Sequence, residues 1–179
     1  NEVSEAIALH SYTDRLFKRP EVFKTFGFDA AYFNKDMKHQ DKLGDSSYIS
    51  DEATFEEVLD YLDSDINQFM HVITMQNHSP IGDKYDTIYP GVKVPSDPNL
   101  EKKLAAYTQG IHYSDQAIEK FIEEVMEMDK KVVVVYYGDH LPGLYNSLLQ
   151  ENNDPFDLYK TDFFITKNFD LDKENIALN

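Results

Sequence analysis

The chain has 179 residues, no cysteine and a formal net charge of −16, from 33 acidic and 17 basic residues. Its hydrophobic fraction of 41% predicts a globular protein with a buried core rather than a disordered chain. The acidic composition argues against a nucleic-acid groove or a basic membrane-binding face, because it repels phosphate groups. The missing cysteines exclude disulfides and thiolate sites.

No apolar run reaches the roughly twenty residues that a membrane-spanning helix needs, and no signal peptide is recognisable. The sequence begins without a methionine, in NEVSEAIALH, which leads directly into an apolar run. We therefore interpret residues 1–179 as a soluble piece of a longer protein and expect them to form a single domain.

The predicted elements begin with a strand, EAIALH (5–10), and a short helix in RPEVFKTFG (19–27). Pro20 suits the first turn of this helix, and Gly27 suits its end. A second amphipathic helix is predicted over TFEEVLDYLDSDI (54–66), opened by a capping box from Thr54 to Glu57.

The second half of the chain continues the alternation. It contains the predicted strand FMHVITM (69–75), a long helix over about 100–128, and the strands KVVVVYY (131–137) and DFFIT (162–166). This order predicts an α/β fold with a mostly parallel sheet flanked by helices. The uninterrupted apolar run VVVVYY is typical of a central strand that is covered on both faces.

Three of these strands are followed by a histidine: His10, His78 and His140. In open α/β sheets, ligands bind beyond the carboxyl ends of the strands. His140 is preceded by Asp139, and both side chains can face one ion only if the backbone bends, as Gly138 allows. A carboxylate beside a neutral imidazole suits Zn²⁺ or Mn²⁺, and the alternative is an Asp-His hydrogen bond that closes a turn.

His78 lies in the turn MQNHSP, where an imidazole can bind an anionic oxygen or act as an acid or base. The alternative is a solvent-facing histidine in a turn. Arg15 and Arg19 follow His10 and suit phosphate or sulfate oxygens, although surface arginines are common. The remaining histidines, His39, His71 and His112, have no supporting context, and we interpret His71 and His112 as structural.

Four segments in order resemble one family, the lipoteichoic acid synthases and related sulfatase-fold phosphoglycerol transferases of the alkaline phosphatase superfamily. YYGDHLPG resembles their metal-binding YGDH segment, and HVITMQNHSPI resembles their segment with a strand followed by an NH.P motif. YTQGIHYSDQAIEKFIEEV is similar to the helix before the metal strand, and ALHSYTDRLFKRPEVFKTFGFD resembles their histidine-containing segment. The resemblance covers about residues 5–145 and identifies the chain as the C-terminal portion of an extracellular catalytic domain.

The resemblance implies that Asp139 and His140 are ligands of a catalytic Mn²⁺, or of another divalent cation such as Zn²⁺ or Mg²⁺. It also implies that His10, Arg19 and His78 line a phosphoglycerol pocket close to these ligands. Phe17 stands where the family often has tryptophan. The family's threonine nucleophile and glutamate ligand precede the segment that matches His10, so we expect no catalytic nucleophile in residues 1–179 and no activity from this chain alone.

The function that the resemblance implies for the longer protein is phosphoglycerol transfer from a lipid to a glycan or teichoic polymer. Such a protein is expected to be anchored in the cell membrane with its catalytic domain outside the cell. Two alternatives stay open, a sulfatase or phosphodiesterase of the same fold and a non-catalytic α/β module that binds an anionic glycan or a protein.

Overall fold

The computed structural model describes residues 3–82, 84–86, 93–144, 154 and 156–170. They belong to two compact units, Asn1–Phe121 and Ile122–Asn179. The elements in chain order are β1 (Glu5–His10), η1 (Leu16–Lys18), α1 (Arg19–Thr25), β2 (Ala30–Phe33), α2 (Asp51–Leu62), β3 (Gln68–Ile73), α3 (Pro98–Glu127), β4 (Val133–Tyr137), η2 (Asp157–Tyr159) and β5 (Phe163–Lys167). The α/β class expected from the sequence is confirmed.

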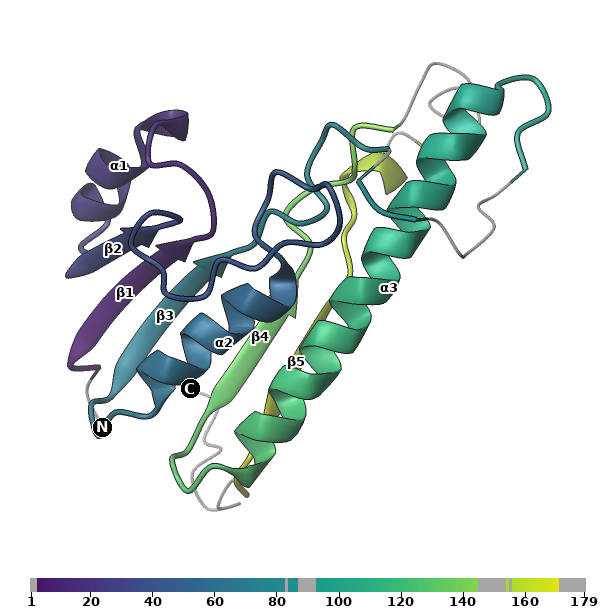
Figure 1. The fold of residues 1–179 in the computed structure, drawn as a ribbon. Coiled ribbons are helices and arrows are strands. Elements are labelled where there is room, and N and C mark those ends of the chain that lie inside the picture. Colours follow the sequence, from purple (N-terminus) through teal and green to yellow (C-terminus); the bar gives the residue numbers. More distant parts are fainter. Residues whose placement is uncertain (1–2, 83, 87–92, 145–153, 155, 171–179) are drawn as a thin grey trace. The chain divides into compact units, whose positions relative to one another are not determined.

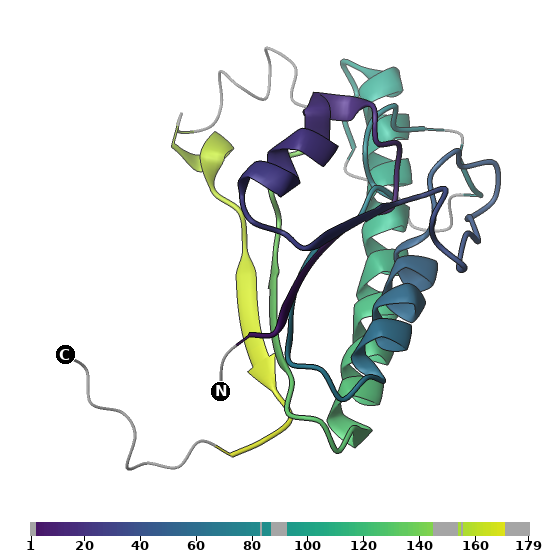
Figure 2. The same cartoon turned by 90° about the vertical axis from the view of Figure 1, so that its left-hand side faces the viewer.

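The first unit contains a fully parallel sheet with the strand order β2-β1-β3 (Figure 1). The central strand β1 is buried along its second half, from Ile7 to His10. Figure 2 shows α1 and α2 on opposite faces of this sheet. Alternate residues of a strand face opposite sides, and Ala8 accordingly packs in one cluster with Phe23 of α1 and Phe33 of β2.

Helix α2 begins three residues before the predicted capping box. Its N-cap is Ser50, whose hydroxyl accepts a hydrogen bond from the backbone N–H of Ala53 at 3.1 Å. The capping box from Thr54 to Glu57 is therefore wrong. The Thr54 hydroxyl donates to the Ser50 carbonyl at 2.9 Å, and the Glu57 carboxylate instead accepts the N–H groups of Lys38 and His39.

The sequence pattern did not predict β2, the short segment AAYF. It pairs with β1 in parallel, with Ala31 opposite Ala8 and Phe33 opposite His10. α1 begins and ends as expected: Pro20 lies in its first turn, and Gly27 follows it with a φ of 87°.

The second unit contains β4 and β5, which pair antiparallel, with Val135 opposite Ile165. We expected VVVVYY to form a central strand of the parallel sheet. This expectation is wrong, because β4 pairs with β5 and the pairing is antiparallel. The side chains of β4 alternate between exposed and half-buried, as in a strand with two different faces. Asn168 ties this hairpin to the end of α3, because the two hydrogens of its Nδ2 are shared among the carbonyls of Val125, Met128 and Lys130.

Candidate active site

His10 is the last residue of β1 and is fully buried. Its ring packs edge-on against Phe33, with the two ring centres 6.3 Å apart. Its Nδ1 lies 3.4 Å from the Ile73 carbonyl. Because a carbonyl can only accept, Nδ1 carries the proton there and Nε2 keeps its lone pair. This Nε2 is buried and has no hydrogen-bond partner within the described residues.

The pKa of His10 is lowered from 6.5 to about 4. Burial is the main cause, and the positive charges of Arg19 and His78 add to it, while the bond to Ile73 acts in the opposite direction. His10 is therefore neutral at physiological pH. The electrostatic influence of Arg19 and His78 on His10 also shows that the structure brings these three predicted site residues close together.

Two tyrosines connect His10 to His78. The ring of Tyr12 lies 6.3 Å from that of His10 and 5.2 Å from that of Tyr48, and Tyr48 lies 5.8 Å from His78. The Tyr48 hydroxyl donates to the Ser79 carbonyl at 2.6 Å and lies 3.4 Å from His78 Nδ1. These contacts form one wall of aromatic rings between the two histidines.

The exposed side chain of His78 is held in one tautomer, because Nδ1 lies 2.7 Å from the Ser79 carbonyl and must donate to it. Its backbone N–H donates to the Met75 carbonyl at 3.0 Å. Lys84 holds the same turn from the other side, since its Nζ donates to the carbonyls of Gln76 and His78 at 3.2 and 2.7 Å. The Lys84 ammonium also lies 4.6 Å from the Tyr48 ring centre, and burial lowers its pKa.

Arg19 is half-buried at the start of α1, and its guanidinium lies 5.8 Å from the ring centre of Phe17. Phe17 is 78% exposed. Phe17 and Lys18 both have positive φ angles, 55° and 51°. Two consecutive side-chain-bearing residues in the left-handed region are strained, and such strain is frequent at ligand sites. Arg15 is exposed, and its backbone N–H bonds to the Thr13 hydroxyl.

Asp139 and His140 follow β4 in the second unit, and both side chains are exposed. The chain bends after Gly138, so that the Asp139 Oδ2 and His140 Nε2 atoms lie 3.8 Å apart. Asp139 Oδ1 accepts the backbone N–H of His140 at 2.9 Å, which is the turn-closing contact that the sequence left open. His140 Nδ1 lies 2.7 Å from the Leu141 carbonyl and donates to it, so that Nε2 keeps its lone pair.

The separation of Asp139 Oδ2 and His140 Nε2 suits two ligands of one divalent ion, but the number of ligands is too small. Two ligands at about 2.1 Å from a tetrahedral ion lie about 3.4 Å apart, close to the observed separation. Among the described residues, however, no group of three or more histidine, aspartate or glutamate side chains could hold a metal ion. A zinc or manganese site usually has at least three protein ligands, so Asp139 and His140 alone do not form a complete metal site.

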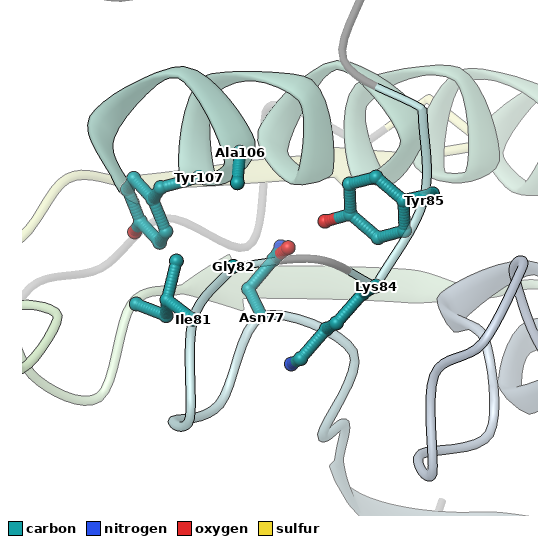
Figure 3. A pocket seen from close by; sticks show the side chains of 7 residues that line it. All are labelled: Asn77, Ile81, Gly82, Lys84, Tyr85, Ala106 and Tyr107. Carbon is teal, nitrogen blue, oxygen red and sulfur yellow. The ribbon is translucent and has the colours of Figure 1, made fainter. Parts of the chain in front are cut away.

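A small hollow of about 10 Å³ opens next to the His78 turn (Figure 3). It has room for about one water molecule and is far smaller than the roughly 300–1,000 Å³ of a typical ligand pocket. Figure 3 shows the Asn77 amide and the Tyr85 hydroxyl pointing toward each other beneath α3, whereas the Lys84 side chain points away. The lining residues are Asn77, Ile81, Gly82, Lys84, Tyr85, Ala106 and Tyr107.

The other histidines have ordinary structural surroundings. His71 packs against the rings of Phe23 and Phe28, and burial lowers its pKa. His39 lies within 3.4 Å of Glu56 and 3.3 Å of Asp60. The sequence pattern did not single out Tyr12, Tyr48 or Lys84, because no local motif marks them and Tyr48 meets His78 across 30 residues of sequence.

A family model described as Sulfatase matches residues 5–177. Lipoteichoic acid synthase 2 of Bacillus subtilis is 30% identical over 139 residues, which is 73% of this chain and 20% of that protein. The chain thus spans about a fifth of the length of the curated relatives that it matches first. Across the described residues, no helix has the length and apolar character needed to cross a membrane.

Two solved structures share the fold. The Streptococcus pyogenes phosphoglycerol transferase GacH, in complex with sn-glycerol-1-phosphate, is 29% identical with a TM-score of 0.78, over 93% of this chain and 44% of that one. The lipoteichoic acid synthase LtaP of Listeria monocytogenes is 22% identical with a TM-score of 0.69, over 91% of this chain and 43% of that one.

Proposed function

Because the chain belongs to the sulfatase family, we propose that residues 1–179 are the C-terminal portion of a larger catalytic domain that transfers phosphoglycerol groups with the help of a divalent metal ion. The observation that carries the proposal is the site around His10, where a buried neutral imidazole lies near Arg19 and His78. The similar structure of GacH is a complex with sn-glycerol-1-phosphate, which supports the same substrate class here.

Each residue of this site suits one part of a phosphoglycerol group. Arg19 can pair with the phosphate oxygens, because a guanidinium presents several N–H donors in one plane. His10 suits a hydroxyl group, since its neutral Nε2 can only accept a hydrogen bond and has no partner among the described residues. The exposed His78 side chain would contact the ligand from the solvent side. The exposed Phe17 ring beside Arg19 would cover the ligand.

Asp139 and His140 would hold the metal, Mn²⁺ or another divalent cation such as Zn²⁺ or Mg²⁺. The bound ion would supply Lewis-acid chemistry, lowering the pKa of a nucleophile and neutralising charge on the phosphoryl group. The His140 Nδ1 contact with Leu141 fixes the ring so that Nε2 can bind the ion.

The nucleophile and the remaining metal ligands are proposed to come from outside residues 1–179. The chain covers 44% of the GacH structure, and its described residues offer only a two-ligand cluster, which supports this view. We also propose that the longer protein is anchored in the cell membrane with this domain outside the cell, since a lipid would be the phosphoglycerol donor. Hydrolysis of a sulfate or phosphate ester by the same site is the second candidate, favoured by the family match.

The test is an assay of the protein with its complete catalytic domain, Mn²⁺ and a phosphatidylglycerol donor. Arg19→Lys and Asp139→Ala should each lower transfer at least tenfold, because each removes a contact to the transferred group or its metal. Arg15→Lys and Asp129→Ala are the matched controls, because they make the same substitutions at an exposed arginine and an exposed aspartate. Both should leave the rate of transfer unchanged. Transfer that is insensitive to both site variants would contradict the proposal, and hydrolysis without transfer would support the second candidate.

A further inference from the structure

A buried polar chain leads from the start of α2 to the turn that carries His78. Its centre is Ser114, on the part of α3 that belongs to the first unit. The Ser114 hydroxyl lies 2.5 Å from the Asp51 carboxylate, 2.7 Å from Asn77 Nδ2 and 3.0 Å from Gln76 Nε2. Asp51, Gln76 and Ser114 are all buried, at 2%, 2% and 5% exposure.

With an ionised Asp51 carboxylate, each hydrogen bond at Ser114 has one donor and one acceptor. A hydroxyl has one hydrogen to donate and two lone pairs to accept. The amides of Asn77 and Gln76 use both lone pairs of Ser114, so its hydrogen must go to Asp51, which acts as the acceptor. Gln76 is fixed further, because its Oε1 accepts the backbone N–H of Asp51 at 2.9 Å. The Ser114 hydroxyl thus uses its hydrogen and both lone pairs, which holds the neighbouring side chains in place, while Asp51 Oδ1 and Asn77 Oδ1 have no hydrogen-bond partner within the described residues.

The orientation of Asn77 follows from the same count. Since Nδ2 donates to Ser114, Oδ1 faces the other way, toward the Tyr85 hydroxyl (Figure 3). Gly110 leaves room for both groups, because a Cβ atom there would overlap Asn77 Oδ1 and the Tyr85 hydroxyl oxygen. The network therefore fixes the two residues that immediately precede His78.

We propose that Asn77 and Ser114 are positioning residues that hold the His78 imidazole in its ligand-binding orientation. The inference rests on the proposed function for the role of His78, and it extends that function to residues that contact no ligand. The alternative is a network that only stabilises the fold. Two of its members, Gln76 and Asn77, directly precede His78, which favours the positioning role. Lys84 holds the same turn from the opposite side, through the carbonyls of Gln76 and His78.

The experiment is a double-mutant cycle on the protein with its complete catalytic domain. The dissociation constant of sn-glycerol-1-phosphate is measured by calorimetry for Asn77→Ala and Ser114→Ala, each with and without His78→Ala. We expect each variant to weaken binding about tenfold when His78 is present and less than twofold when it is absent. Ser114→Thr keeps the hydroxyl and should restore binding to within about threefold.

Equal losses with and without His78 would overturn the proposal, because the network would then act through the fold alone. Asn77→Ala is the decisive variant if Ser114→Ala does not fold, since Asn77 lies in a half-buried turn. If the unaltered protein does not bind the probe, the proposed function fails, and the NMR signal of the His78 ring decides the positioning role. A narrow single signal that broadens or splits in Asn77→Ala supports it, and an unchanged signal overturns it.

Discussion

At the scale of single residues, the site depends on a histidine whose charge is removed by its surroundings. His10 ends the central strand of the parallel sheet, and its ring lies on the face that packs against α1. Among the described residues, no acidic group offsets the cost of protonating His10, because the groups that act on its pKa are Arg19, His78 and a carbonyl. A neutral imidazole with a free Nε2 lone pair is therefore a stable feature of the folded protein.

This charge state makes stability depend on pH. The pKa of His10 falls from 6.5 to about 4 on folding, so between these values the unfolded chain binds more protons and stability is lost as pH falls. The free energy of unfolding should lose about 2 kcal/mol through His10 between pH 7.5 and pH 5. Urea unfolding of the protein and of His10→Gln at both pH values measures this.

The comparison between the two proteins isolates His10 from other titrating groups, such as the buried Asp51, whose pKa is raised by burial. His10→Gln should show a pH dependence that is smaller by about that amount. Identical pH dependences for the two proteins would mean that the folded His10 accepts a proton near its ordinary pKa, and the buried neutral imidazole would be ruled out.

Residue by residue, the strand-end pattern predicted where His10 and His78 lie in the fold, and their roles in a site stay a prediction. His10 and His78 follow strands, and Arg19 follows His10 closely, so their convergence could be predicted from the order of elements. Tyr48 and Lys84 could not, because they reach His78 only through the folding of two loops. Gly44 permits one of these approaches, since a Cβ atom there would overlap the Lys84 carbonyl.

At the scale of elements, α3 shows a conflict between helix propensity and packing. Gly110 lies inside this helix, where alanine would stabilise it by about 0.5–1 kcal/mol. The added methyl group would however displace Asn77 and Tyr85, and such overpacking costs about 1–3 kcal/mol. We expect Gly110→Ala to lower the free energy of unfolding by about 1–2 kcal/mol, measured by chemical denaturation.

Thr108→Ala in the same helix is the matched control, because Thr108 is exposed and its hydroxyl bonds only to the carbonyl of Leu104. It should be neutral or slightly stabilising, by no more than about 0.5 kcal/mol. If Gly110→Ala were as stable as this control, Asn77 and Tyr85 could not be held against the helix as the structure places them.

Asn168 provides the corresponding contact in the second unit. Its Nδ2 lies within 3.1 Å of three carbonyls at the end of α3 and shares two hydrogens among them, and its Oδ1 accepts the backbone N–H of Val132 at 2.8 Å. Asn168→Ala should cost about 2 kcal/mol, because it leaves these groups without their partner. Asn168→Asp should cost more, since it presents a negative oxygen to carbonyl oxygens. Thermal unfolding of both variants would show this order, and the reverse order would exclude the amide as the donor.

The element boundaries show where sequence patterns were informative. The strand 5–10 and the long helix were predicted nearly to the residue, because apolar periodicity marks them. The start of α2 was misplaced because a second capping pattern, Ser50 with Ala53, precedes the one that was chosen. β2 was missed because four residues without β-branched side chains give little signal.

At the scale of the whole molecule, the chain carries many acidic side chains, but those in the described residues form no group of three or more that could hold a metal ion. Its net charge of −16 attracts divalent cations diffusely. We expect the isolated 179-residue chain to show neither saturable binding of one Mn²⁺ nor turnover of a generic phosphodiester. Calorimetry with Mn²⁺, beside an Asp139→Ala control, checks this. One tightly bound ion that is lost in the control would mean that these residues contain a complete metal site.

We propose that His10, Arg19 and His78 bind a phosphoglycerol group and that Asp139 and His140 bind a divalent ion. The most direct measurement is a crystal structure of the protein with its complete catalytic domain, grown with Mn²⁺ and sn-glycerol-1-phosphate. The account predicts Mn²⁺ bound by Asp139 and His140, the phosphate within hydrogen-bond distance of Arg19, and a glycerol hydroxyl on His10 Nε2. A phosphate bound away from Arg19, His10 and His78, with the ion on other residues, would contradict it.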